Sequence, residues 1–597
     1  MFKLKSGIFF LLFIFYFSIC SAQDNYYGLE RIVVLRNNQG LNGKSSLKAN
    51  DLEFLPFTSP VEALSILPID LQARSPNSAI QADFSLRGSN FQGVRVLFNG
   101  KQINDPQTGH HNSDIPLTRE DIAEVEVIPG VAPLNSGPDA VGGSVNFITK
   151  RPQERKFILE LSGGEYQTSG ELLSLSDKIN DLGLRFSLEN KESAGFSTDT
   201  DFKKFTANMA SALDLPLGSF DLDFGYQEKE FGAYDFYTPA KGYPSKEWTK
   251  TYLLDTGLNL VKEGLTIKPN FLWRRHFDKF MLDKTGIRSN YLASHRTDSY
   301  TPSLYLNKSG TNLGKIGLGL EYSKDIINST SLGKHSRQRK SVYIDDACNF
   351  FESFLVESSL RVDDYDGIDT SLTGGVKFTY AFQESDFLYS GISRNIRIPS
   401  FTELYYNDPT TTGNAALSPE KSLSYEIGYK RKREAFSWGM TLFFRDEDNF
   451  IDWVKSDSSQ ARWEAANIAS SGVFGIEEHL AYKINDKIDL SANYTYTNRR
   501  KNDNGYIYKY GENYARHLVS LISFFRLNCG IQEVGFTYKK TPVRNGWLLA
   551  HMRLSYDLNK NSNIFFSATN IFNVEYQEIE GVPSPGRWIE GGLRLKW

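Results

Sequence analysis

Residues 82–150 read ADFSLRGSNFQGVRVLFNGKQINDPQTGHHNSDIPLTREDIAEVEVIPGVAPLNSGPDAVGGSVNFITK. Three β-type runs, at residues 94–98, 124–128 and 144–149, are separated by turns rich in glycine. In the second run Val125 and Val127 alternate with Glu124 and Glu126, as in a strand with one buried face. The pattern predicts a small mixed sheet with polar loops.

Two short helices are expected beside this sheet. Ser59 is a good N-cap, Pro60 suits the first helical position, and Glu62 follows the cap by three residues. Thr118 and Asp121 repeat the capping pattern with Asp in place of Glu. Together these signals indicate a small α+β domain.

Ordered motifs within this domain resemble a known family. LRG (residues 86–88), FNG (98–100), EVEVIPG (124–130) and DAVGGSVNFITK (139–150) resemble the plug domain of TonB-dependent outer-membrane receptors. Members commonly carry an Arg where this chain has Pro129, so an ion pair from that Arg is not expected. The resemblance implies a plug inside a transmembrane barrel.

The N-terminus has the pattern of a secretory signal peptide. Lys3 and Lys5 precede an uncharged run at residues 8–19, and Ala22 offers a cleavage site before Gln23. The run is too short to span a bilayer core of about 30 Å, which argues against the alternative of an N-terminal anchor. Cleavage leaves 65 basic and 71 acidic side chains (67 − 2 against 71), a net charge of −6 that does not favour nucleic acid.

The composition is typical of a transmembrane β-barrel. Aromatic residues make up 14% of the chain, yet the mean hydropathy is −0.39. An apolar lipid face, aromatic girdles and a polar lumen account for both values. The 447 residues after residue 150 (597 − 150) suffice for a 22-stranded barrel at about 20 residues per strand and connection. Sixteen or 18 strands with longer loops would also fit, and the count of about 22 comes from the family.

Alternating segments support this interpretation of the second part of the chain. The final strand places Ile589, Leu593, Leu595 and Trp597 on one face, and its terminal aromatic resembles the assembly signal of outer-membrane barrels. The same period of two occurs at residues 182–188, 220–226, 488–497 and 550–558.

Further family-like segments extend the resemblance over nearly the whole mature chain. They lie at residues 397–430, 467–477 and 568–588. The expected organisation is a signal peptide (1–22), a periplasmic N-terminal segment (23–50), a plug (51–150) and a barrel (151–597).

An isolated β-forming run precedes the plug. It is the candidate TonB box, the segment that would pair with an edge strand of TonB through main-chain hydrogen bonds. The alternative is the first strand of the plug. The candidate residues are Arg31, Ile32, Val33, Val34 and Leu35.

The candidate ligand site combines a plug loop with two barrel segments. The loop at residues 104–112 is rich in hydrogen-bonding side chains, and the barrel segments at residues 231–248 and 273–280 are aromatic or basic. The alternatives are a solvated loop that contacts the barrel wall and basic residues that meet lipopolysaccharide phosphates. The candidates are Asn104, Asp105, Gln107, Thr108, His110, His111, Asn112, Tyr234, Phe236, Tyr237, Arg274, Arg275 and His276.

Metal and thiol chemistry receive little support from the sequence. The adjacent His110 and His111 have no second ligand pair at metal-binding spacing, so no metal site is predicted. After signal cleavage only Cys348 and Cys529 remain, and the spacing leaves a disulfide and two free thiols both open.

The resemblance implies a receptor of the Gram-negative outer membrane, surrounded by lipid and lipopolysaccharide. It would bind a scarce nutrient and import it with energy from TonB and the inner-membrane ExbB–ExbD motor; a surface lipoprotein partner stays open. The loops resemble the cobalamin-receptor branch, with ferric siderophores or haem as the alternative. A passive porin is the alternative of another class. No G-x-S-x-G elbow, catalytic residue or cofactor motif points to an enzyme.

Overall fold

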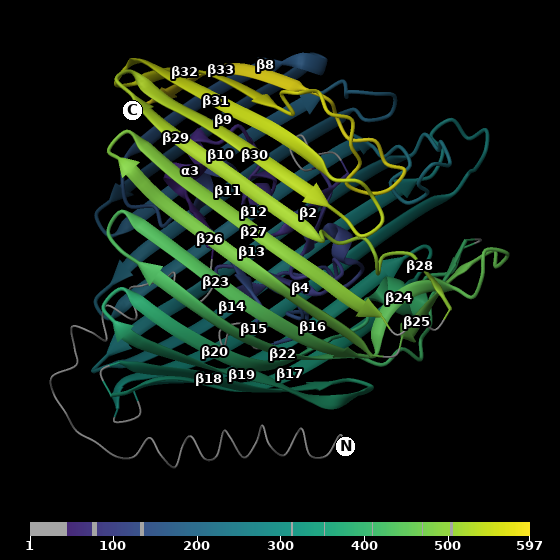
Figure 1. Ribbon diagram of the computed structural model, residues 1–597, viewed down its shortest axis with the longest axis horizontal. Coiled ribbons are helices and arrows are strands. Elements are labelled where there is room, and N and C mark those ends of the chain that lie inside the picture. The colour runs from purple at the N-terminus through teal and green to yellow at the C-terminus, as the bar shows by residue number, and fades with distance from the viewer. Residues whose placement is uncertain are drawn as a thin grey trace.

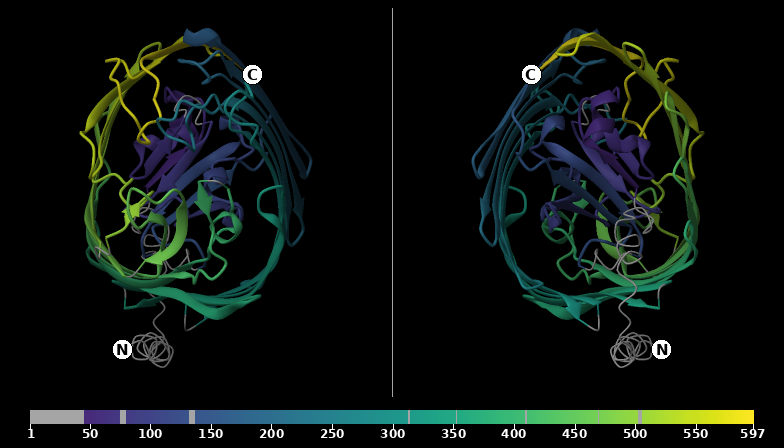
Figure 2. Two further views of the ribbon diagram at one scale, coloured as in Figure 1. Left: turned by 90° about the vertical axis from the view of Figure 1, so that its right-hand side faces the viewer. Right: turned by 90° about the vertical axis from the view of Figure 1, so that its left-hand side faces the viewer.

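The computed structural model describes residues 45–74, 80–131, 137–311, 314–351, 353–408, 410–468, 470–501 and 505–597. These residues form a closed barrel of 22 antiparallel strands with a smaller domain inside it (Figures 1 and 2). The predicted signal peptide and the candidate TonB box lie outside the described residues. None of the helices in the described ranges is long and apolar enough to cross a bilayer.

The inner domain, the plug, is built on a mixed five-stranded sheet in the order β1-β6-β7-β4-β5. β4 runs parallel to β7, whereas β6 and β7 are antiparallel. Val125 and Val127 of β6 are fully buried, which confirms the predicted sheet and its half-buried strand. The strands are β1 (Ser45–Lys48), β4 (Val94–Phe98), β5 (Lys101–Gln102), β6 (Ile122–Pro129) and β7 (Gly143–Thr149), and a separate pair joins β2 (Asp70–Ala73) to β3 (Ala82–Ser85).

The helical elements are short. At η4 the predicted capping box is present, because the backbone N–H and the hydroxyl of Thr118 both donate to the Asp121 carboxylate at 2.8 Å. The other predicted helix is a 3-10 helix that begins only at Glu62, and Ser59 caps the turn before it by accepting from the Val61 N–H at 3.3 Å. The elements are α3 (Ala49–Phe54), η1 (Glu62–Ile66), η3 (Gly109–His111), η4 (Arg119–Asp121), η6 (Glu165–Gln167) and α4 (Phe401–Tyr405).

The barrel strands are tilted and hydrogen-bonded mostly to their sequence neighbours, as Figure 1 shows. The first eleven are β8 (Lys156–Gly164), β9 (Thr168–Ile179), β10 (Leu182–Ser193), β11 (Phe202–Leu215), β12 (Gly218–Gly232), β13 (Lys246–Lys262), β14 (Leu265–Met281), β15 (Leu292–Thr311), β16 (Gly314–Ser329), β17 (Gly333–Phe350) and β18 (Phe354–Tyr365). The others are β19 (Ile368–Gln383), β20 (Asp386–Arg397), β22 (Glu420–Lys432), β23 (Phe436–Asp448), β26 (Ser471–Asn485), β27 (Ile488–Lys501), β29 (His517–Leu527), β30 (Gly530–Lys540), β31 (Trp547–Asn559), β32 (Ser562–Thr569) and β33 (Trp588–Lys596).

Side chains alternate between the lipid face and the lumen. On β10, Leu184 and Phe186 are 44% and 41% exposed, whereas Arg185 and Ser187 are buried. Both buried residues reach the plug, because Arg185 Nε and Ser187 Oγ donate to Asp121 at 2.9 and 2.6 Å. The period of two therefore separates membrane contacts from plug contacts.

The last strand closes the barrel. β33 pairs with β32 on one side and with β8 on the other. Trp597 exchanges two backbone hydrogen bonds with Phe157, at 2.7 and 3.0 Å. The terminal strand thus joins the two ends of the barrel sheet.

The two ends of the barrel differ. Two-residue turns at 216–217 and 263–264 lie at one end, and longer connections at 233–245, 282–291 and 570–587 lie at the other. At the long-loop end a small sheet folds over the lumen, formed by β21 (Thr411–Thr412), β24 (Phe450–Lys455), β25 (Trp463–Ile468) and β28 (Ile507–Tyr508). In outer-membrane barrels the long loops are extracellular, so this end faces the medium.

The two cysteines within the described residues are not joined. Cys348 is buried on β17, and Cys529 is exposed in the turn after β29. Both are free thiols.

Candidate ligand-binding site

The plug loop at residues 104–112 is folded tightly against its own sheet. Asn104 accepts a hydrogen bond from the Val96 N–H at 2.8 Å and donates to the Val94 carbonyl at 2.9 Å. Asn112 accepts from the Asp105 N–H at 2.8 Å, which closes the loop. These contacts hold the tip of the loop, with η3, in a fixed position below the barrel mouth.

A large cavity lies between this tip and the long-loop end of the barrel. It encloses about 1420 Å³ of empty space, part of which is open to solvent. Eight aromatic side chains line it: Phe91, Tyr237, Tyr243, Phe280, Tyr291, Tyr406, Trp453 and Tyr510. A concave site that combines aromatic side chains with polar groups is typical of small-molecule binding.

His110 is part of the floor of this cavity. Its ring stacks on Phe91, with centroids 4.1 Å apart, and lies edge-on to Tyr510. Asp83 accepts from His110 Nδ1 at 2.8 Å and also pairs with Arg74 at 3.0 Å. Burial lowers the pKa of His110 to about 4, so at pH 7 the ring is uncharged and acts as an aromatic surface.

The charges of the described lining residues do not form a cationic site. The acidic residues are Asp278, Glu403 and Asp408, and the basic ones are Arg288 and Lys509. Arg288 donates to the carbonyls of Gly242 and Lys241 at 2.8 and 3.0 Å, so its guanidinium is already engaged. The cavity therefore suits a ligand with little net charge.

Of the predicted site residues, five line this cavity. From the plug these are Gln107, Thr108, His110 and His111, and from the barrel loop Tyr237. Tyr237 accepts from Gln81 Nε2 at 2.6 Å.

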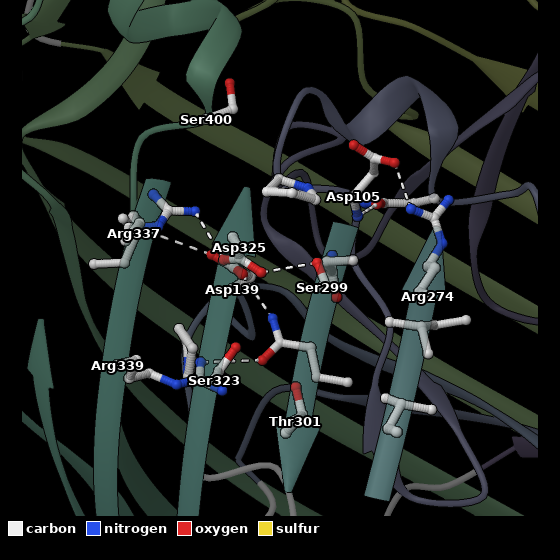
Figure 3. A pocket seen from close by; sticks show the side chains of 18 of the residues that line it. Asp105, Asp139, Arg274, Ser299, Thr301, Ser323, Asp325, Arg337, Arg339 and Ser400 are labelled. Carbon is white, nitrogen blue, oxygen red and sulfur yellow. Dashed lines mark hydrogen bonds and ion pairs between the residues drawn. The ribbon is translucent and has the colours of Figure 1, made fainter. Parts of the chain in front are cut away.

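Four others lie at a second, polar cavity between plug and wall, of about 820 Å³ of empty space. These are Asn104, Asp105, Asn112 and Arg274. Figure 3 shows Arg274 directed at Asp105, with which it forms a buried ion pair, and Arg337 directed at Asp325. Each charge in these two pairs is matched by an oppositely charged side chain.

The remaining four lie elsewhere. Arg275 follows the alternation of β14, faces away from the lumen and pairs with Asp298 at 2.6 Å. Phe236 is buried in an apolar cluster, and Tyr234 is half-buried outside both cavities. His276 faces the lumen and lies against His111, with ring centroids 4.5 Å apart.

Several lining residues carried no local signal in the sequence. Phe91, Tyr406, Trp453 and Tyr510 come from the plug and from three distant barrel loops. Only closure of the barrel brings them together. The sequence shows that these residues are aromatic, but whether they line the same cavity depends on the register of the barrel strands.

An ion network anchors the plug to the wall opposite β14. Arg87 of the LRG motif donates to Glu426 of β22 at 2.9 Å and to Glu477 of β26 at 2.6 and 3.0 Å. Lys377 pairs with Glu426 at 3.2 Å. A Cβ on Gly130 would lie 1.9 Å from Arg87 Nη1, so the glycine of EVEVIPG leaves room for this guanidinium.

Comparison with known proteins agrees with the architecture. The sequence model of the TonB dependent receptor-like β-barrel matches residues 165–571, and that of the TonB-dependent receptor plug domain matches residues 28–144. The chain belongs to the TonB-dependent receptor family. It is therefore a transporter of the Gram-negative outer membrane that binds a small-molecule ligand and works with TonB, and it is not an enzyme.

Individual relatives are distant but similar in length. The vitamin B12 transporter BtuB of Photobacterium profundum is 23% identical over 557 residues, which covers 89% of each chain. The homologous transporter of Vibrio vulnificus (strain YJ016) is 21% identical over 568 residues, covering 91% of this chain and 89% of that one. The siderophore receptor PirA of Pseudomonas aeruginosa has a TM-score of 0.74 at 17% identity, covering 94% of this chain and 100% of that one.

Proposed function

We propose that this TonB-dependent receptor imports a large, weakly charged, amide-rich nutrient of the corrinoid class, such as cobalamin. The observation that carries the proposal is the cavity lined by eight aromatic residues in which acidic and basic side chains roughly balance. Similarity to transporters named for vitamin B12 over 89% of the chain supports it.

The chemistry of the cavity matches such a ligand. Aromatic rings such as Tyr510 and the neutral ring of His110 offer flat surfaces for the apolar parts of a macrocycle. Gln107, Thr108 and the tyrosine hydroxyls offer hydrogen bonds to peripheral amides.

A ferric siderophore or haem is the second candidate, and Lys509 favours it because both ligands are commonly anionic. The other basic residues predicted for this role are not free to serve it. Arg274 is paired with Asp105, and Arg275 faces away from the lumen. The corrinoid is therefore preferred.

Calorimetric titration of the purified, detergent-solubilised receptor with cyanocobalamin tests the proposal. We expect nanomolar binding, and we expect Tyr510→Ala to weaken it by about 10- to 100-fold, because truncating a stacked aromatic anchor costs on the order of 2 kcal/mol.

Tyr305→Ala, outside the cavity lining, is the matched control and should bind as the wild type does. A panel of ferric siderophores and haem is titrated in parallel. Tight binding of one of these, with no heat from cyanocobalamin, would replace the corrinoid by that ligand.

A further inference from the structure

Three potential metal ligands converge where the plug meets the barrel wall. His111 and Asp114 belong to the plug, and His276 projects from β14. His111 Nδ1 and His276 Nε2 each lie 3.6 Å from the same oxygen, Asp114 Oδ2. Each of the three residues offers a ligand atom within 4.8 Å of the other two.

Two of these atoms are buried without a hydrogen-bond partner. His276 is 0% and Asp114 is 2% exposed. Within the described part of the chain, neither His276 Nε2 nor Asp114 Oδ2 has a partner at hydrogen-bond distance. Buried polar atoms rarely remain unsatisfied, so something other than the described protein atoms should interact with them.

The opposite nitrogen of each histidine is held in place. His111 Nε2 lies 3.4 Å from Asp278 Oδ2, and His276 Nδ1 lies 2.9 Å from Thr251 Oγ1. Metal-binding histidines typically use their second ring nitrogen in this way, which fixes the tautomer and aims the other nitrogen at the ion. The arrangement selects His111 Nδ1 and His276 Nε2 as the ligand atoms.

The charge around the site also favours a cation. Asp114 pairs through its other oxygen with Lys229, whereas no described Lys or Arg forms an ion pair with Asp278 or Glu247. When both histidines are neutral, Asp114 and Asp278 together with Lys229 carry a net charge of −1. A bound cation would offset this charge.

We propose that His111, Asp114 and His276 bind one divalent transition-metal ion of the Zn²⁺ class and so join the plug to the barrel wall. Two imidazoles and one carboxylate suit Zn²⁺ better than Ca²⁺ or Mg²⁺, which prefer oxygen ligands. Tetrahedral bonds of about 2.0–2.1 Å place ligand atoms about 3.3 Å apart. The separations of 3.6 Å need to close by only a few tenths of an ångström.

A proton on His111 is the competing occupant. Although burial opposes a charge on this ring, the nearby carboxylates of Asp114 and Asp278 raise its pKa well above the usual value. Zn²⁺ must displace that proton to bind. The fourth coordination position is left for water.

Metal binding to the full, detergent-solubilised receptor tests the proposal. After removal of metal with a chelator, titration with Zn²⁺ should show one site of submicromolar affinity. His276→Gln and Asp114→Asn should each weaken it by at least about 100-fold, and Thr251→Val by about 10-fold as a positioning residue. His551→Gln is the matched control, since His551 is also buried on a barrel strand, beside Glu533, and belongs to neither cluster of potential ligands.

A second readout does not depend on how the variants fold. Co²⁺ bound to the wild-type receptor should give the visible absorption of a tetrahedral site, and Zn²⁺ should remove it. Absence of stoichiometric Zn²⁺ and Co²⁺ binding by the wild type would overturn the proposal. So would binding that persists unchanged in folded His276→Gln and Asp114→Asn.

Discussion

Replacing Arg87 with Met is expected to lower the free energy of plug unfolding by about 3–5 kcal/mol, the usual cost of breaking a buried ion pair by removing one partner. Arg87 is buried and bridges Glu426 and Glu477. Lys377 still neutralises Glu426 in the variant, but Glu477 loses its only described cation. The measurement is the urea midpoint for tryptic cleavage of the plug within the folded barrel, which should fall by more than about 1 M.

Two further variants separate charge from packing. In Arg87→Met/Glu477→Gln the uncompensated carboxylate is removed, so a large part of the stability should return. Arg526→Met removes a surface pair with Asp489, in which the side chains are 45% and 31% exposed, and should cost no more than about 1 kcal/mol. If the double variant is no more stable than Arg87→Met, the unpaired charge is not the cause of the destabilisation.

The fold was accessible from the sequence because its periodicities are local. Alternation along residues 182–188 corresponds to a strand whose leucines and phenylalanine face lipid and whose Arg185 faces the plug. The run at residues 94–98 is β4 with the same bounds. The number of strands could not be derived from periodicity, because several counts fitted the length of the chain. The predicted value of 22, which the structure confirms, came from the resemblance.

The site was only partly accessible, for physical reasons. On β14 the period of two places Arg275 on the opposite face of the strand from Arg274 and His276. The sequence alone could therefore have excluded Arg275 from the ligand site. The position of Asp114 beside His276 could not have been inferred. The proximity of Asp114 to His276 depends on how far the plug enters the barrel and on the register of β14. The sequences around these two residues predict neither property. The convergence of His111, Asp114 and His276 as potential metal ligands could not be inferred for the same reason.

A receptor that binds its ligand tightly needs energy to release it, and we expect the N-terminal segment to receive that energy from TonB. A dissociation constant of about 1 nM corresponds to roughly 12 kcal/mol. With an association rate near 10⁷ M⁻¹s⁻¹, release would take on the order of 100 s. The outer membrane has neither ATP nor an ion gradient, so work must reach the plug through TonB. We propose Arg31, Ile32, Val33, Val34 and Leu35 as the contact.

Deleting residues 23–36 should therefore abolish uptake by whole cells while leaving ligand binding at the surface unchanged. Because β-augmentation uses main-chain hydrogen bonds, the double variant Val33→Pro/Val34→Pro should have the same effect, since proline cannot donate one. Val33→Thr/Val34→Thr keeps the β-branched, extended character and should transport normally. Uptake and binding of the same labelled ligand are measured on the same cells. If the proline variant transports as well as the threonine variant, this run does not pair with TonB, and the alternative of a plug strand is favoured.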